Sequence, residues 1–423
     1  MRTLALLVLA GAFTVTLLPG PWGDESVTDL FLYRSYADLF LAGSLPYRDV
    51  AFEYPPLAAP LLALPGVPGS GDGDYRLAFA ALALGLAAIL VMFVGGLARR
   101  TGGDPRRAML AAAVFPLFTG AMLRTHFDLA PVALTLGALL LLASNRPRTG
   151  LAVLGAAVMT KGFPLVVAPV AVAWLVAHDR RREAVEGMAA LALVVVTVAG
   201  AAAVASPGGA ADAVAYHLNR PAQVESAPAL VLLGLDGLGA GRADLVHSHG
   251  SEGVRHPASP AVVALFGVLL IGAVCVMTVG VVRGVSAAHG GGEGSGARTL
   301  VLAALGAVAA FAAFGKVLSP QFLIWLVPLA ALAFGWRRPA LGAAATAAIA
   351  LTLVEFPAHY PDVVDRDPAA LWLVAVRDAM LALAVALVAR ELYRGEAPLR
   401  RSKSAPPPVA APVSGAPARG SAL

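Results

Sequence analysis

The sequence has little cysteine and little charge, and each shortage excludes a class of protein. Its 423 residues include one cysteine, Cys275, which lies in an apolar run. A single cysteine excludes an intrachain disulfide and any cysteine-based metal cluster. Only 13% of the residues are charged, whereas 58% are hydrophobic. This balance excludes an ordinary soluble protein and is typical of a polytopic membrane protein.

Signals of nucleotide and nucleic-acid binding are also missing. The GxG patterns lie in apolar runs or linkers and not between a strand and a helix, which argues against a Rossmann-like nucleotide site. The net charge of +5 does not indicate a nucleic-acid partner, because the basic residues cluster at the ends of apolar runs, where they encode membrane topology. We therefore expect no nucleic-acid binding.

Apolar runs separated by charged or proline-rich breaks predict an all-α, polytopic membrane protein with about twelve spans. They form one transmembrane domain over 1–390, with a first outer loop at 20–75 and a second at 206–259. The proline-, alanine- and arginine-containing tail, 391–423, is predicted to be disordered and cytoplasmic. The expected spans are 3–19, 76–98, 108–123, 129–143, 150–160, 164–177, 187–205, 260–282, 299–315, 321–335, 340–354 and 369–389.

The charges of the loops predict the orientation. RRTGGDPRR, NRPR, HDRRRE and WRR lie in alternate gaps between the spans. The positive-inside rule makes these gaps and both termini cytoplasmic, so the first outer loop faces the outside. Residues 150–177 are short for two crossings and leave open a re-entrant element or one kinked span. We interpret them as two helices broken at Lys161, because HDRRRE then falls on the arginine-rich side.

The segment 29–57 is a polar, aromatic and acidic island between the first two spans. Asp29 is predicted to open a helix that ends at Gly43, and Pro55 and Pro56 to start the next helix. Asp29 and Glu53 therefore lie on ordered backbone that does not cross the membrane.

The other outward gaps contribute polar side chains at the same face. Ionisable groups near membrane depth are costly and indicate function. Arginine and lysine suit a phosphate, and a carboxylate suits the removal of a proton from a hydroxyl. The candidate catalytic residues are Asp29 and Glu53, and the candidate substrate-binding residues are Arg124, Lys161, His217, Arg220, Lys316, Gln321, Tyr33 and Tyr54.

Simpler structural roles remain open for several of these residues. Asp29 follows Thr28 and could cap a helix. Arg124 and Asp128 are spaced for an ion pair within one helix. Lys161 could extend to the membrane interface. His217 and Arg220 could be loop surface, and Tyr33 and Tyr54 interface anchors. The segment HSHGSEGVRH is interpreted as a flexible, solvated loop in preference to a metal site.

Four segments taken together resemble glycosyltransferase family 87, the polyprenol-phosphate-mannose-dependent mannosyltransferases of bacteria. They are the first loop with Asp29 and EYPPL, the segment KGFP at Lys161, the run YHLNRPAQVES, and SPQF with Trp325. The resemblance covers residues 29 to about 380.

This resemblance implies a GT-C fold in a bacterial plasma membrane and an extracytoplasmic active site. It implies a polyprenol-phosphate sugar as donor, a glycolipid or glycan as acceptor, and inverting single displacement. Asp29 matches the base, and Lys161, His217 and Arg220 match donor-phosphate ligands. We expect no metal and no other cofactor. The alternative is a transporter or lipid-linked-sugar flippase, which should show related halves; no counterpart of the first loop is found in the second half.

Overall fold

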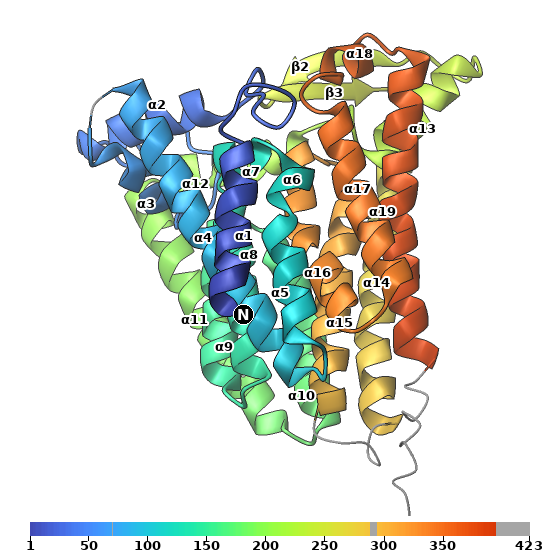
Figure 1. The fold of residues 1–423 in the computed structure, drawn as a ribbon. Coiled ribbons are helices and arrows are strands. Elements are labelled where there is room, and N and C mark those ends of the chain that lie inside the picture. The colour runs from blue at the N-terminus through green and yellow to red at the C-terminus, as the bar shows by residue number, and fades with distance from the viewer. Residues whose placement is uncertain (70, 288–293, 395–423) are drawn as a thin grey trace, which may run out of the picture.

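The computed structural model describes residues 1–69, 71–287 and 294–394. A bundle of helices makes up most of the molecule, and a layer of short helices and strands covers one of its ends (Figure 1). The helices of the bundle are α1 (Arg2–Val15), α4 (Asp72–Arg100), α5 (Pro105–Val114), α6 (Pro116–Thr119), α7 (Met122–Thr125), α8 (Leu129–Leu142), α9 (Pro147–Thr160), α10 (Val167–Ala177), α11 (Arg181–Ala205), α14 (Ser259–Ala287), α15 (Gly294–Phe314), α16 (Val327–Gly335), α17 (Pro339–Glu355) and α19 (Pro368–Arg394).

Charged and capping residues define the ends of α4 and the start of α5. The first turn of α4 carries two acids and its last turn carries Arg99 and Arg100, which complement the helix dipole. Asp104 caps α5: its carboxylate accepts a hydrogen bond of 2.9 Å from the backbone N–H of Arg106, and Pro105 occupies the first helical position.

Five helices in the described ranges, α4, α11, α14, α15 and α19, are long and apolar enough to cross a membrane. The apolar window of α15 is 78% buried and that of α11 only 6%, so α15 lies at the centre and α11 faces lipid. The chain is a multi-pass membrane protein. A helix lies in each predicted span, but a 14-residue helix such as α8 is about 21 Å long. The number of twelve spans therefore stays a prediction.

Residues 150–177 form two helices, as the sequence predicts. α9 ends at Thr160, and the 3-10 segment η2 (Phe163–Val166) leads into α10. The first outer loop contacts this break, where the backbone N–H of Leu57 donates to the carbonyl of Met159 at 2.9 Å. The break thus provides a contact site for the first outer loop.

The covering layer consists of two segments that are far apart in sequence. The first outer loop contributes α2 (Leu30–Leu41), α3 (Ala58–Ala63) and η1 (Leu64–Gly66). The second contributes α12 (Pro207–Asn219), β1 (Ala222–Gln223), α13 (Ala227–Gly237), β2 (Asp244–Ser248) and β3 (Ser251–Arg255), and α18 (Tyr360–Val364) lies beside them. The 3-10 segment η4 (Pro320–Leu326) underlies this layer before α16.

The fold is mostly helical, as predicted, but three short strands add a small sheet that an all-α prediction does not include. They form an antiparallel sheet in the order β1-β3-β2, with Leu245 opposite Val254. The flexible loop expected at HSHGSEGVRH is also wrong, because this segment is the β2–β3 hairpin. His249 and Gly250 make its two-residue turn, with φ of 55° and 66°, and two positive φ values match the twist of a hairpin.

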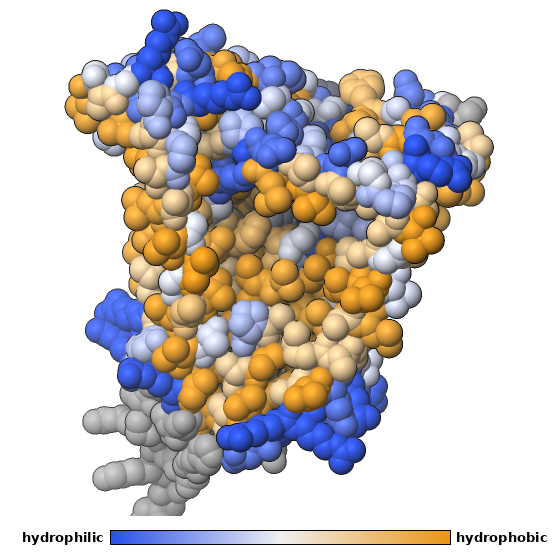
Figure 2. Space-filling model, turned by 180° about the vertical axis from the view of Figure 1, so that it is seen from behind, coloured by the Kyte–Doolittle hydropathy of each residue, from blue (hydrophilic) through white to orange (hydrophobic). Residues whose placement is uncertain are grey.

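The two ends of the molecule differ in the loops that they carry. The covering layer lies at one end, and the arginine-bearing loops before α5, α9 and α11 lie at the other (Figure 1). An apolar belt separates two hydrophilic ends (Figure 2). This separation agrees with the alternation of loops predicted from charge. The predicted tail, 391–423, lies almost wholly outside the described residues, and α19 extends to Arg394.

Candidate functional site

Asp29 is the residue before α2, but its carboxylate does not cap the helix. No capping hydrogen bond from its side chain exists; instead the hydroxyl of Thr28 accepts from the N–H of Leu30 at 3.2 Å. The capping role that the sequence left open is therefore wrong. The carboxylate is available for other contacts, and its side chain is 35% exposed.

Three side chains from different elements surround this carboxylate. The hydroxyl of Tyr33 donates to Oδ2 of Asp29 at 3.1 Å. The Nε2 amide of Gln321, on η4, lies 3.5 Å from the same oxygen. The Nε2 atom of His126, after α7, lies 3.6 Å from it. Burial and the charge of Asp29 raise the pKa of Tyr33 well above its ordinary value, so Tyr33 remains a neutral donor.

A buried ion pair lies on the far side of Gln321. The Nζ atom of Lys161 lies 3.5 Å from Oε1 of Gln321 and donates to Oδ1 of Asp128 at 2.7 Å. The indole N–H of Trp325 donates to the same oxygen at 2.6 Å. The ammonium also lies 4.8 Å from the ring centroid of Phe127. Lys161 is therefore held in place by Asp128 and aromatic rings instead of extending to the membrane interface.

Arg124 contacts the N-terminal segment and not Asp128. Its Nε atom donates to the carbonyl of Thr16 at 2.8 Å, and its guanidinium pairs with Glu25. The ion pair between Arg124 and Asp128 that the spacing allowed does not form. These contacts hold the segment that precedes α2, so the structure does not bring Arg124 into the group around Asp29.

A row of tyrosines leads from Asp29 to Glu53, with the ring centroids of Tyr33 and Tyr54 6.2 Å apart. Burial raises the pKa of Tyr54 well above its ordinary value, and the charges of Asp29 and Glu53 raise it further. Burial and then Glu53 likewise raise the pKa of Tyr216, on α12. Nε2 of His217 contacts the backbone carbonyl of Glu53 at 2.8 Å. The charges of both acids thus act on Tyr54, and α12 contacts the backbone at Glu53 through His217.

Beyond Glu53, positive groups gather around β1 and β3. An Nη atom of Arg220 donates to the hydroxyl of Ser251 at 2.7 Å, while its buried Nε has no partner among the described residues. Nζ of Lys316 donates to the carbonyl of Leu218 at 2.7 Å. Burial lowers the pKa of Lys316, and the charge of Arg220 lowers it further.

We call Arg220 and Lys316, with His217 beside them, the cation cluster. Burial lowers the pKa of the neighbouring His249, and so do the charges of Arg220 and Lys316. No carboxylate in the described part of the chain lies within 4 Å of Arg220 or Lys316. The cluster therefore presents net positive charge beside Glu53, an arrangement suited to an anionic group such as a phosphate.

A buried group of charges lies behind β1, and the sequence analysis missed most of it. Arg377, on α19, is 0% exposed. It donates to the carbonyl of Glu225, contacts Asp378 at 3.0 Å and lies 3.5 Å from Glu355. The signal was present, because an arginine and an acid inside an apolar helix indicate a buried partner. This group holds the segment that carries Arg220, since Gln223 contacts both Arg220 at 3.4 Å and Glu225 at 3.0 Å.

We predict a pH-dependent stability that arises from Glu225. Burial and the nearby Glu355 raise its pKa well above the ordinary value of 4.5. The folded state therefore binds this proton more tightly than the unfolded state, and stability falls as the pH rises above that value. Glu225→Gln, which mimics the protonated form, should weaken the decline in melting temperature with rising pH. An unchanged pH dependence in this variant would contradict the prediction.

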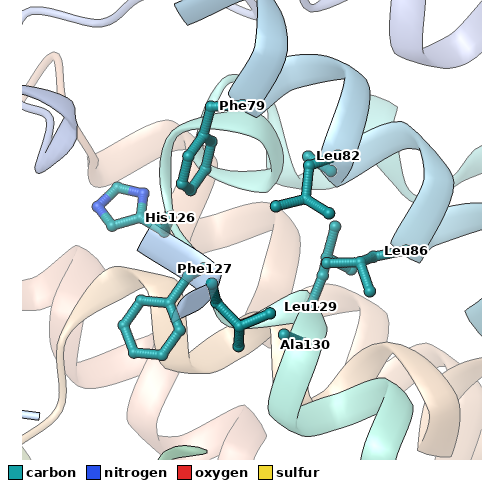
Figure 3. A pocket seen from close by; sticks show the side chains of 9 residues that line it. Phe79, Leu82, Leu86, His126, Phe127, Leu129 and Ala130 are labelled. Atoms are coloured by element: carbon teal, nitrogen blue, oxygen red, sulfur yellow. The ribbon is translucent and has the colours of Figure 1, made fainter. Parts of the chain in front are cut away.

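An apolar pocket adjoins the Asp29 group. Figure 3 shows the imidazole of His126 between Phe79 and Phe127 at the edge of this pocket, with Leu82 and Leu86 opposite. The ring is therefore polar on the side of Asp29 and surrounded by hydrocarbon on the other side. His126 could not be assigned a role from the sequence, because its neighbour Asp29 is distant in the chain.

No protein-family model matches the chain, and no curated protein sequence does. Among solved structures, the chain is similar to the oligosaccharyltransferase of Archaeoglobus fulgidus in its apo form, with a TM-score of 0.43 and 14% identity. It is also similar to oligosaccharyltransferase AglB of that organism in complex with an inhibitory peptide and a dolichol-phosphate, with a TM-score of 0.32 and 16% identity. Each match covers 91% of this chain and 56% of the solved chain. Similarity this low does not establish a shared fold, so the function proposed below rests on the residues of this chain.

Proposed function

We propose that the chain is a membrane glycosyltransferase of the GT-C type that transfers a sugar from a polyprenol-phosphate donor to a hydroxyl of a glycolipid or cell-envelope glycan. One observation supports it most. The covering layer holds both the carboxylate of Asp29, which does not cap its helix, and the cation cluster, in which Arg220 and Lys316 have no carboxylate partner among the described residues. The resemblance to family 87 favours mannose as the sugar. We further propose that this layer faces the exterior of a bacterial cell, with both termini in the cytoplasm.

Asp29 and the cation cluster suit the two sides of a displacement reaction, which are the attacking hydroxyl and the leaving phosphate. Asp29 accepts the proton of the acceptor hydroxyl while that oxygen forms a bond to the anomeric carbon of the donor. The bond from that carbon to the donor phosphate oxygen breaks, and the phosphate leaves with the bonding electrons. Arg220 and Lys316 stabilise the negative charge that grows on the phosphate. One carboxylate suffices, because the nucleophile is already a bound hydroxyl. No metal enters this proposal.

The remaining candidate residues position the base or shape the site. Gln321 and Tyr33 hold the carboxylate of Asp29 in position through the contacts described above. Lys161 has two polar contacts, to Asp128 and Gln321, and faces the donor as a largely neutralised cation. Glu53 and Tyr54 shape the space between the base and the cation cluster. Glu53 remains the second candidate for the base.

A transfer assay tests the proposal. Purified protein in detergent or vesicles would receive a polyprenol-phosphate sugar with a labelled sugar and a candidate glycolipid acceptor. We expect labelled acceptor and free polyprenol phosphate in equal amounts. Movement of the intact donor across vesicle membranes without transfer, for every sugar tried, would overturn the proposal in favour of a flippase.

Arg220→Gln should weaken use of the donor. A hydrogen bond to a charged group contributes about 1.5–3 kcal/mol, so we expect kcat/KM for the donor to fall about 10- to 150-fold. Arg242→Gln is the matched control, because Arg242 lies in the same outer loop with a side chain that is 88% exposed, and it should leave donor kinetics unchanged. Equal kinetics in both variants would remove Arg220 from the donor site.

A further inference from the structure

His126 is placed to exchange a proton with the proposed base. It is 5% exposed, and its Nε2 atom lies 3.6 Å from Oδ2 of Asp29. Its Nδ1 atom lies 3.0 Å from the hydroxyl of Thr125 and 3.3 Å from the carbonyl of Met122. Within the described residues, these are the polar groups that the ring contacts.

The partners of Nδ1 determine where the ring carries its proton. The carbonyl of Met122 can only accept a hydrogen bond. The hydroxyl of Thr125 donates its own hydrogen to the carbonyl of Ala121 at 3.0 Å, so towards His126 it acts as an acceptor. Both partners therefore require a hydrogen on Nδ1. In the neutral ring, Nε2 is then unprotonated, and its lone pair faces the carboxylate of Asp29.

The carboxylate oxygen and the unprotonated ring nitrogen are both hydrogen-bond acceptors, so no hydrogen bond joins them. One added proton would be shared by the two groups, either as a carboxyl group beside a neutral ring or as a carboxylate beside an imidazolium. The proposed reaction delivers one such proton to Asp29 in each turnover.

We propose that His126 is a positioning residue that acts through the proposed base, Asp29. It accepts from Asp29 the proton that Asp29 removes from the acceptor hydroxyl. This inference rests on the proposed function. The proton moves from the acceptor oxygen to Oδ of Asp29 as the new glycosidic bond forms and the phosphate leaves. It then passes from Oδ2 to Nε2 of His126 and restores the carboxylate. It returns through Asp29, whose side chain is 35% exposed, to solvent.

The surroundings of the pair favour this exchange. On its other side the ring meets the apolar pocket with Phe79, Leu82 and Leu86 (Figure 3), so no competing acceptor from the described parts of the chain faces it there. The other titratable groups reach the pair through Asp29. They are Tyr33, which donates to Oδ2, Lys161 with Asp128, which connect through Gln321, and Tyr54, whose pKa is raised by burial and by the charges of Asp29 and Glu53.

His126→Asn is the test variant, because an asparagine amide can replace Nδ1–H towards Thr125 and Met122 but offers no base at the position of Nε2. We expect kcat to fall roughly 10²-fold, at the low end of general acid–base effects. The pair of groups shares the added proton and Asp29 alone cannot, so the acid limb of the pH–rate profile should also move to lower pH. His126→Gln is the second variant and should show the same shift in the profile.

Two comparisons separate this inference from a structural role and from the proposed function. His256→Gln changes a histidine that is 7% exposed and distant from Asp29, and should leave the acid limb in place. If His126 acts through Asp29, the double variant Asp29→Asn/His126→Asn should be no slower than Asp29→Asn alone. An unshifted acid limb in both His126 variants, with Asp29→Asn inactive, would overturn this inference alone. Full activity of Asp29→Asn would overturn the proposed base.

Discussion

Asp29→Asn should lower the turnover number about 10³-fold, within the range that a positioned general base contributes. Asparagine keeps the size and the hydrogen-bond acceptor of the side chain, so Tyr33 can still donate to it. It cannot accept the proton of the acceptor hydroxyl. Donor binding should be retained, because the cation cluster is untouched. The measurement is sugar transfer at saturating donor, together with donor affinity determined in the absence of acceptor.

The matched control is Asp38→Asn on the same helix. The carboxylate of Asp38 pairs with Arg34 and is 55% exposed, so its loss should cost little activity. Glu53→Gln is the decisive companion variant. An active Asp29→Asn enzyme with an inactive Glu53→Gln enzyme would identify Glu53 as the base. Loss of donor binding in Asp29→Asn would mean that this carboxylate organises the donor site instead.

Arg377→Met should destabilise the protein by about 3–5 kcal/mol, the usual result of removing one partner from a buried group of charges. Arg377 is the cation among three buried acids, with Glu355 1% exposed and Asp378 8% exposed. Its removal leaves these carboxylates without a nearby positive charge. The measurement is the unfolding free energy or melting temperature of the purified protein in one detergent.

The position of the charge decides the size of this effect. Arg182→Met removes an arginine that is 87% exposed and pairs with Glu186 in one helix, and it should cost less than about 1 kcal/mol. Glu355→Gln added to Arg377→Met should recover part of the loss, because it removes one of the uncompensated carboxylates. Equal destabilisation by Arg377→Met and Arg182→Met would show that the buried group does not stabilise the fold.

Much of the helical framework could be predicted from the sequence, because apolar runs between charged breaks are a local signal. The break at Lys161 and the start of α2 at Asp29 are further examples. The β2–β3 hairpin was missed because its strands carry histidine, serine and glutamate without a clear apolar alternation. The His-Gly turn was the usable signal, since both residues tolerate a positive φ.

The candidate site was predictable as a set of residues but not as a set of contacts. Asp29 and Arg220 are recognisable because charged groups beside apolar spans are costly. The partner of each charge depends on packing between distant segments. Arg124 is near Asp128 in sequence and yet pairs with Glu25, whereas Asp128 pairs with Lys161, 33 residues away. His126 could not be linked to Asp29 without the fold.

The contact between Gln321 and Asp29 joins residues that are 292 positions apart. This separation determines how long after Asp29 its amide partner is synthesised. Ribosomes add ~5–20 residues per second, so roughly 15–60 s pass between the emergence of the acid and that of its amide partner. During this interval the nascent chain presents Asp29 without one of the groups that orient it. If Asp29 is the base, as proposed, its surroundings are complete only when most of the helices have entered the bilayer, and chains that stop before Gln321 are expected to be inert.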